Sequence, residues 1–414
     1  MNHGRFIILK PFFRFAIPFL PIVGKWEKVL SHIGEVIDVW MIVQRKWMYL
    51  ESIFIGSGDI RTQLPDEAAR FDRIDRSFKK IMNETAKNNI VLDACNQEGC
   101  LTILQELSNQ LEACQKSLSD YLESKRNAFP RFFFISDDEL LSILGSHDPK
   151  NIQEHIIKMF DNVIKLNYGT GRNEKAVLGM QSAEGENLDY RQIVATQGRV
   201  EEWMTAVQNE MKHTNRLIHK EAVFYYPNMD RKDWIYKYQG MVSLAGSQIW
   251  WTFFVEDAFM KIKSGDKLAM KRLSKQLSDQ LDDLVAEVRS DLSSNNRKKI
   301  NTQIIIDVHA RDIIDKFVRD SVIAEDDFQW ESQLRFYWDK SSDELLAKQC
   351  TGTFDYGYEY MGLNGRLVIT PLTDRCYLTL TQAISMHLGG SPAGKIISIF
   401  YLQTKIVKRT CWDW

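Results

Sequence analysis

Residues 99–125 read GCLTILQELSNQLEACQKSLSDYLESK, and this stretch decides the fold class. Its leucines recur mainly at steps of three and four residues, at positions 101, 104, 107, 111, 118 and 122. Glu and Gln fill much of the sequence between them. This spacing places the leucines on one face of an α-helix. The sequence therefore predicts a long amphipathic helix that packs against neighbouring helices.

The same periodicity continues on both sides of this stretch. It predicts an earlier amphipathic helix over residues 25–54, with Trp26, Leu30, Ile37 and Met41 on its apolar face and Gly34 as a candidate break, and another helix over residues 66–87. It predicts several helices over residues 200–289 and a further one over residues 301–321. Leucines at 273, 277, 281 and 284 form a seam of the kind that coiled coils and helix pairs bury. The chain is therefore expected to be mainly α.

Several shorter segments interrupt the helical pattern. The run 128–135 (AFPRFFFI) predicts a short buried strand or extended segment. Ser136 and Glu139 form a capping box that opens the next helix. A helix is predicted over residues 151–166, and five glycines within residues 167–199 indicate a small β-containing excursion.

The pattern changes again in the last quarter of the chain. An aromatic run at residues 334–338 predicts a strand, and residues 377–387 predict a helix. A β-branched run lies between them at residues 367–370. This alternation of strand and helix indicates that a second domain begins near residues 340–350.

Composition excludes several classes of protein. The chain has 414 residues, of which 44% are apolar and 26% charged, so it is too apolar to be disordered. Its formal net charge of −2 argues against a nucleic-acid binder, which needs an excess of Lys and Arg. Prolines 11, 18 and 21 interrupt the apolar N-terminal run, which favours a buried or artificial chain start over a signal peptide or membrane span. The six cysteines show no CxxC pair, which favours a reduced, intracellular setting and argues against structural zinc.

The clearest chemical motif lies near the C-terminus. Residues 389–395 (GGSPAGK) fit the spacing G-x-x-x-x-G-K of a phosphate-binding loop, with Gly394 and Lys395 as its last two residues. Position 396 is Ile, whereas the motif needs a Ser or Thr hydroxyl on Mg²⁺. The following residues resemble a strand rather than the helix that should open there. The sequence therefore predicts an altered turn rather than a working phosphate-binding loop.

Other candidate sites have simpler explanations. His309 and Asp312 have the spacing of helix neighbours, so a structural pair is favoured over a catalytic one. The acidic run 325–327 is interpreted as a surface segment or helix cap rather than a cation site. Trp250 and Trp251 are interpreted as core residues rather than a ligand platform.

Five segments together resemble a known family. They are residues 42–51 (IVQRKWMYLE), 125–134 (KRNAFPRFFF), 307–312 (DVHARD), 356–360 (YGYEY) and 369–375 (ITPLTDR). In this order they resemble dynein heavy chains, and their sequences are most similar to those of axonemal inner-arm heavy chains. The resemblance covers residues 14–394.

The resemblance implies a particular architecture. Residues 14–340 would form the linker, an elongated stack of helical bundles with a small β-containing excursion. Residues 341–394 would begin the α/β fold of the first AAA+ module, which would be truncated here. Residues 1–13 and 395–414 match nothing in the family and are expected to be foreign to it. In the family the linker bends and straightens as ATP is turned over, and this movement drives the power stroke.

The resemblance also implies a cofactor and partners. Full-length relatives use ATP and Mg²⁺, and the backbone at Pro371, Leu372 and Thr373 would lie near the adenine. Gly394 and Lys395 would be a remnant of the phosphate-binding loop, so this chain alone is expected to hold no cofactor and to have no catalytic or metal-binding residue. The implied partners are the AAA+ ring of the same heavy chain, dynein intermediate and light chains, and microtubules in the cytoskeleton of the ciliary axoneme. Neither nucleic acid nor a membrane is implied.

Two alternatives to a motor fragment remain at this point. One is a non-catalytic helical scaffold that binds dynein or other axonemal partners. The other is an autonomous nucleotide-binding protein that uses Lys395.

Overall fold

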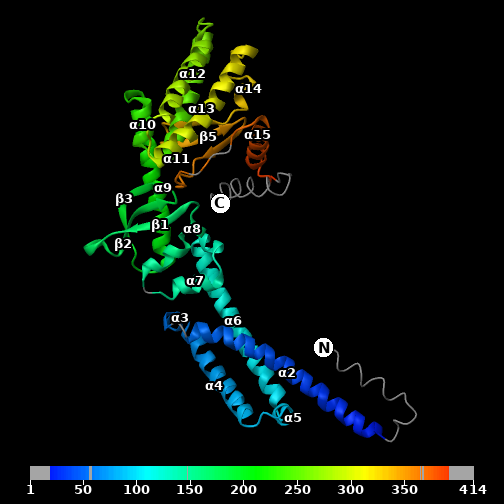
Figure 1. The fold of residues 1–414 in the computed structure, drawn as a ribbon. Helices are drawn as coiled ribbons and strands as arrows, with labels where there is room; N and C mark the ends of the chain where they lie inside the picture. Colours follow the sequence, from blue (N-terminus) through cyan, green and yellow to red (C-terminus); the bar gives the residue numbers. More distant parts are fainter. Residues whose placement is uncertain (1–18, 56–57, 147, 364, 366–367, 391–414) are drawn as a thin grey trace. The chain divides into compact units, whose positions relative to one another are not determined.

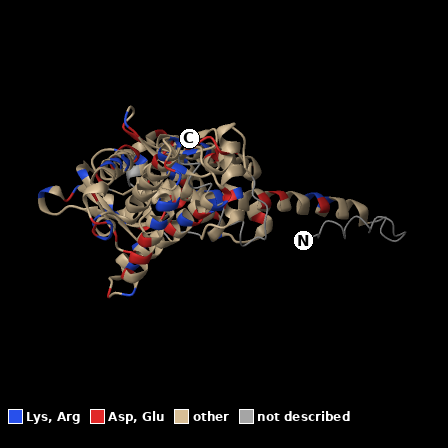
Figure 2. Ribbon diagram, turned by 90° about the horizontal axis from the view of Figure 1, so that it is seen from above, with Lys and Arg blue, Asp and Glu red and all other residues tan. Residues whose placement is uncertain are grey.

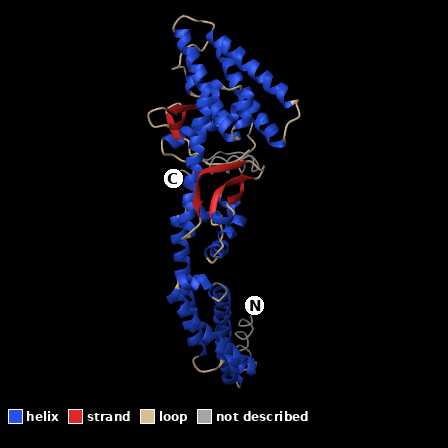
Figure 3. Ribbon diagram, turned by 90° about the vertical axis from the view of Figure 1, so that its left-hand side faces the viewer, coloured by secondary structure: helices blue, strands red, loops and turns tan. Residues whose placement is uncertain are grey.

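The structure is a computed structural model that describes residues 19–390 except 56–57, 147, 364 and 366–367. The chain forms two compact units, Met1–Ile152 and Gln153–Trp414. Helices make up most of both units, and two small antiparallel sheets lie within the second (Figure 3). The predicted mainly α fold class is therefore confirmed.

The first unit is built around three long helices, α2, α4 and α6 (Figure 1). Shorter helices join and follow them. The bounds are α2 (Leu20–Phe54), α3 (Gly58–Gln63), α4 (Pro65–Lys87), α5 (Val91–Cys95), α6 (Cys100–Ala128), the 3-10 helix η3 (Pro130–Phe134) and α7 (Asp137–Leu144).

The leucine face of α6 forms the centre of this unit. It is buried against α2 and α4, and its buried residues include Leu104, Leu107, Leu111, Leu118 and Leu122. Phe71 of α4 stacks on Phe54 of α2 with ring centroids 5.4 Å apart. The predicted packing role of residues 99–125 is confirmed.

Helix α2 differs from the expectation in two respects. It runs through Gly34 without a break, because a single glycine costs only about 1 kcal/mol in a helix interior. Its buried residues lie from Ile33 onward, where α4 and α6 pack, and they are Ile33, Val36, Val43, Leu50, Ile53 and Phe54. Several expected apolar positions are exposed instead, namely Trp26, Leu30, Ile37 and Met41.

The run after α6 is not a strand. Residues Pro130–Phe134 form η3, in which Phe132 packs edge-to-face on Phe129 with centroids 4.9 Å apart. A proline at the first position favours a tight helical turn, so the expectation of an extended segment was wrong. The capping box is confirmed: Ser136 Oγ accepts a hydrogen bond from Glu139 N, and the Glu139 carboxylate accepts one from Ser136 N.

The second unit begins with a three-stranded antiparallel sheet. The predicted helix over residues 151–166 was wrong, because a 3-10 helix, η4 (Pro149–His155), and a single turn, α8 (Ile156–Met159), lead directly into a strand. Helix α8 ends at Met159, where Phe160 is already extended, and Asn162, with a positive φ of 60°, lies in the turn that leads into the β-branched pair Val163 and Ile164. The strands are β1 (Val163–Tyr168), β2 (Ala176–Ser182) and β3 (Asn187–Ala195), with the short 3-10 helix η5 (Gly171–Asn173) between the first two. The predicted β-containing excursion is therefore confirmed, with an earlier start.

Helices and a second antiparallel sheet complete this unit. The bounds are α9 (Val200–Tyr225), η6 (Tyr226–Asn228), α10 (Arg231–Lys237), α11 (Gly240–Lys263), α12 (Ala269–Val288), α13 (Ser294–Asp320), α14 (Phe328–Glu331), β4 (Arg335–Asp339), β5 (Glu344–Gln349), β6 (Gly352–Asp355) and α15 (Pro371–Ser385). The strand predicted at 334–338 is confirmed as β4. The β-branched run at 367–370 lies partly outside the described residues, and its described part, 368–370, is not in a strand.

The core of the helical part lies between α11, α12 and α13. The leucine seam of α12 is buried, as predicted. Trp251 lies in this core beside Trp330, whose ring centroid is 5.4 Å away. Trp250 is half-buried and stacks on Tyr226 at 5.2 Å. The interpretation of the tryptophan pair as packing residues is confirmed.

Charge and hydropathy behave as the composition predicts. Lys, Arg, Asp and Glu are interspersed along the helices seen in Figure 2. Among the described helices, none combines the length and apolarity that a membrane span requires. Asp327 caps α14 by accepting a hydrogen bond from Gln329 N at 2.8 Å, so the helix-cap interpretation holds for this acidic residue.

Residues 356–363, called the connector below, lead from β6 toward α15 and are held from one side by α9. Asn215 Nδ2 donates a hydrogen bond to the Tyr358 carbonyl at 2.8 Å. The buried His219 ring lies against Tyr356 and Tyr358, with centroids 5.2 and 5.7 Å away. Its Nδ1 donates to the Asn215 carbonyl, whereas its Nε2 is buried with no hydrogen-bond partner. Burial lowers the pKa of His219 to about 4.

The first sheet holds the connector from the other side. The Tyr360 hydroxyl donates to the Glu186 carbonyl at 2.9 Å, and Asn162 Nδ2 donates to the Met361 carbonyl at 2.9 Å. The Glu186 carboxylate also accepts from Gly240 N at the start of α11. Gly362 has a φ of +59°, and a Cβ placed there would lie 2.3 Å from Ser182 Cβ. The connector is therefore enclosed by α9, α11 and the first sheet.

Because His219 is buried and neutral, we expect the fold to lose stability in acid. The unfolded chain takes up a proton on this histidine near pH 6.5, but the folded chain does so only near pH 4. The stability that His219 contributes is therefore present above pH 6.5 and is lost as the pH falls toward 4, to a total on the order of 3 kcal/mol. The measurement is urea unfolding at pH 7.5 and 4.5, followed by hydrogen exchange of peptides from α9. His219→Gln should reduce the pH dependence, whereas His213→Gln, at an exposed position on the same helix, should keep it. If the unfolding free energy of His219→Gln depends on pH as steeply as that of the wild type, this account is contradicted.

The connector has no room for a side chain at position 362. Gly362→Ala introduces a Cβ into Ser182 and a side chain at a left-handed backbone position, so we expect a loss of about 2–4 kcal/mol in unfolding free energy. Gly365→Ala is the control, because a Cβ there would have no atom within 4 Å. It should remain within about 0.5 kcal/mol of the wild type. Urea unfolding followed through connector peptides measures both, and equal stability of the two variants would refute the close packing.

Candidate functional site

The three residues expected near adenine form the first turn of α15. The helix begins at Pro371 rather than near Tyr377, because Thr370 caps it: Thr370 Oγ1 accepts from Thr373 N at 3.3 Å. Pro371 occupies the first helical position, where its missing N–H costs nothing. The Leu372 side chain is 71% exposed and Thr373 is half-buried. The expected helix is therefore confirmed, with a start six residues earlier than predicted.

Gly394 and Lys395 lie outside the described residues. The interpretation of residues 389–395 as an altered phosphate-binding loop therefore stays a prediction. Just before this stretch, α15 ends at Ser385, and a turn follows at His387, which has a φ of 57°. Gly390 then packs closely on Leu380, since a Cβ at position 390 would lie 2.2 Å from Leu380 Cδ2.

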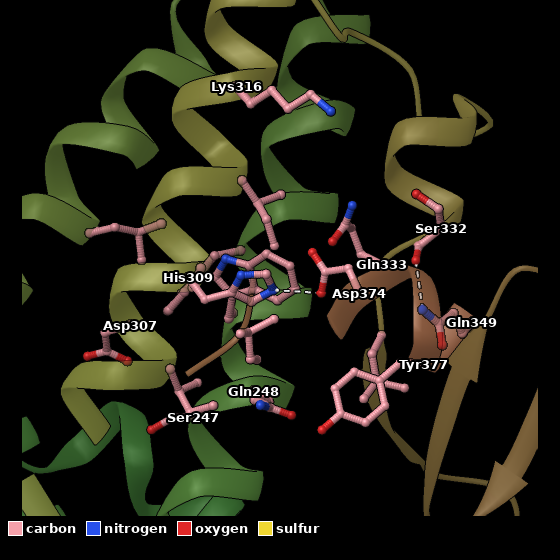
Figure 4. Close-up of a pocket in the computed structure, with 18 of the residues that line it drawn as sticks. Ser247, Gln248, Asp307, His309, Lys316, Ser332, Gln333, Gln349, Asp374 and Tyr377 are labelled. Atoms are coloured by element: carbon pink, nitrogen blue, oxygen red, sulfur yellow. Dashed lines mark hydrogen bonds and ion pairs between the residues drawn. The ribbon is translucent and has the colours of Figure 1, made fainter. Parts of the chain in front are cut away.

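A cavity of about 420 Å³ lies beside the first turns of α15 (Figure 4). Helices α11 and α13 form one wall, and α15 with the region around α14 and β5 forms the other. Its lining combines aromatic and aliphatic side chains such as Trp251, Phe254 and Ile313 with the polar groups Gln248 and Gln333. Pro371 also lines it, whereas Leu372 and Thr373 do not.

One pair of titratable groups faces across this cavity. His309 Nε2 of α13 lies 3.8 Å from Asp374 Oδ1 of α15 (Figure 4). Burial lowers the pKa of His309, opposed by the Asp374 charge, and burial raises the pKa of Asp374, opposed by His309. Each group therefore limits the cost of burying the charge on the other.

The partner of His309 is not the one that sequence spacing suggested. Asp312 bonds Arg311, with Arg311 Nη2 donating to Asp312 Oδ1 at 2.6 Å. The structural pair of His309 and Asp312 that the spacing favoured is therefore not formed, because His309 turns toward α15 instead. Local spacing carries no signal for a contact between residues so far apart in the sequence.

A second residue that sequence reasoning missed is Gln349 at the end of β5. Its buried side chain bonds both Ser332 and Thr381, and so joins the sheet to α15. No motif or periodicity marks this position.

The described residues do not bring together a metal centre. Among them, no group of three or more His, Cys, Asp or Glu side chains is placed to hold an ion. Five cysteines, Cys95, Cys100, Cys114, Cys350 and Cys376, are free thiols, and Cys411 lies outside the described part of the chain. The candidate site is thus a contact region between α13 and α15, which contains a cavity and the His309–Asp374 pair.

Two family models match the chain. Residues 11–222 match "Dynein heavy chain, N-terminal region 2", and residues 356–396 match "Hydrolytic ATP binding site of dynein motor region". The first match covers the first unit from residue 11 onward, the first sheet and most of α9. The second begins at the connector and contains α15. The boundary predicted between residues 340 and 341 stays a prediction.

Individual relatives agree with the family models. The chain is 63% identical over 383 residues to human dynein axonemal heavy chain 10 and 59% identical over 380 residues to the dynein-1-alpha heavy chain of the flagellar inner arm I1 complex of Chlamydomonas reinhardtii. It is 42% identical to the ciliary dynein beta chain of Tripneustes gratilla. These matches cover 91–92% of this chain but only 8% of each relative. The chain belongs to the dynein heavy chain family, in which it corresponds to the second N-terminal region and the beginning of the hydrolytic ATP-binding site.

Proposed function

We propose that this chain is the linker of an axonemal dynein heavy chain together with the first elements of its ATP-binding module. In that heavy chain the helical part acts as the lever of an ATP-driven motor on microtubules. The names of the relatives, which are axonemal, flagellar or ciliary dyneins, support a place in the ciliary axoneme. The AAA+ ring of the same heavy chain, and dynein intermediate and light chains, are the partners that this function requires.

The observation that carries this proposal is the enclosure of the connector. The connector opens the segment that matches the ATP-binding family, yet it is held by Asn215 of α9 and Glu186 of the first sheet. Both residues lie in the part that matches the N-terminal region. Since these two residues bond the connector directly, a displacement of the N-terminal part acts on the segment that matches the ATP-binding family.

The start of α15 has the surface that an adenine base needs. Val368 and Leu372 expose 66% and 71% of their side chains and flank Pro371 at the N-terminal end of the helix. Apolar side chains beside accessible backbone suit a planar heteroaromatic ring. Bound Mg–ATP supplies the free energy of the stroke through hydrolysis of its terminal phosphate. The residues of this chain would contact its adenine end.

A substitution of Leu372 tests whether its exposed apolar side chain contacts the adenine. In a full-length heavy chain that carries this segment, Leu372→Asp places a charge against the base and should weaken ATP binding about tenfold or more. The same change should leave α15 folded, because an acidic residue in a first turn suits the helix dipole. The measurement is the dissociation constant for a fluorescent ATP analogue.

Ile323→Asp is the matched control. Ile323 is 62% exposed and lies between α13 and α14, outside the segment that matches the ATP-binding family. Its ATP affinity should stay within twofold of the wild type. If both substitutions, or neither, weaken binding, the adenine does not lie at the first turn of α15.

A further inference from the structure

Helix α15 buries very little apolar surface. Of its residues, all of which the structure describes, Leu380 alone is buried. Leu372 in the first turn is largely exposed, and so is Met386 just after the last. Apolar burial is the usual means by which a helix is held on its neighbours, so the position of α15 must depend on other contacts.

Apolar packing is also incomplete on the side of α15 that faces α13. The cavity of about 420 Å³ lies there, where a close-packed interface would have side chains. The His309–Asp374 pair reaches across, at 3.8 Å. This distance is too long for a well-formed hydrogen bond, so the pair orients α15 only loosely.

The side of α15 that faces the second sheet is different, because Gln349 fastens it. Gln349 is 3% exposed. Its Oε1 accepts a hydrogen bond from Thr381 Oγ1 at 2.9 Å, and its backbone carbonyl accepts one from Gln382 Nε2 at 2.9 Å. The Thr351 hydroxyl, in the turn that follows β5, bonds the other end of the Gln382 amide at 3.0 Å.

The amide of Gln349 is itself held in one orientation. Its Nε2 donates to the Ser332 carbonyl, at the C-terminal end of α14, at 2.9 Å (Figure 4). With the nitrogen facing α14, the oxygen must face Thr381. A buried amide that lost either partner would leave a polar group unsatisfied, so this arrangement resists rotation of the side chain.

We propose that Gln349 is a positioning residue that sets α15, and with it the Pro371–Thr373 turn, against the second sheet. This inference rests on the proposed function in one respect, namely that the turn contacts ATP. Gln349 does not touch the nucleotide. It acts through Thr381 and α15, so that the helical part of the chain, through α14 and β5, determines where the adenine-contacting turn lies.

The first experiment measures the position of α15 without any nucleotide. Gln349→Met keeps the length of the side chain but removes its bonds to Ser332 and Thr381. In the 414-residue chain we expect peptides from α15 to exchange their amide hydrogens about tenfold faster. Gln333→Met is the control, because Gln333 lines the same cavity but its Nε2 bonds only the nearby Gln329 carbonyl at 2.9 Å. Unchanged exchange of α15 in Gln349→Met overturns the proposal.

A second variant covers the case in which Gln349→Met does not fold. Thr381→Val removes the same contact from the α15 side, where the residue is only half-buried. It should also speed exchange in α15. Combined in a variant that folds, the two changes should add less than their separate effects, because they remove one shared bond. Full additivity would show that the two side chains act separately and would overturn the proposal.

The last experiment uses a full-length heavy chain that carries this segment. There Gln349→Met should raise the KM for ATP about fivefold while kcat at saturating ATP changes less than twofold. A KM unchanged in a variant whose α15 exchanges faster shows that α15 does not place the nucleotide, which contradicts the inference. If the wild-type heavy chain binds no ATP, the proposed function itself fails, and the exchange experiment alone decides whether Gln349 holds α15.

Discussion

The buried carboxylate of Glu186 joins segments that are far apart in the sequence. It accepts a hydrogen bond from Gly240 N, where α11 begins, and it lies 3.5 Å from Lys299 Nζ of α13. The hydroxyl of Tyr360, in the connector, bonds the carbonyl of the same residue. Burial raises the pKa of Glu186, opposed by the Gly240 amide and the Lys299 charge. A group so costly to bury is stable only while all its partners are in place.

This requirement constrains the rest of the second unit. The hairpin between β2 and β3, the start of α11 and the connector must come together before the carboxylate is satisfied. With the connector in this position, Asn215 of α9 bonds the Tyr358 carbonyl and the His219 ring packs against the Tyr356 ring. The enclosure of the connector is therefore cooperative, and it explains how a short segment without regular secondary structure is held against the part of the chain that matches the N-terminal region.

The sequence predicted those parts of the fold that local periodicity determines. The leucine faces of α6 and α12 and the capping box at Ser136 follow from spacing alone, and all are confirmed. The predictions failed where a short turn redirects the chain, as between α8 and β1, where Phe160 is extended and Asn162 takes a left-handed backbone conformation. They also failed on α2, because periodicity shows that apolar faces exist but not which face a neighbour covers. At the candidate site, the role of Pro371–Thr373 rests on the resemblance and stays a prediction, whereas the Gln349 and His309 contacts depend on tertiary packing and leave no local pattern.

The cavity beside α15 has a mechanical consequence. A close-packed protein interior resists compression, whereas a void offers little resistance to side chains that move into it. The packing on the α13 side therefore opposes a displacement of α15 toward α13 only weakly, and the bonds to the buried Gln349 amide on the sheet side are the main resistance to it. The position of α15 is then set by a few directional hydrogen bonds rather than by a packed apolar interface. Once these bonds break, no close packing on the α13 side holds the helix in place.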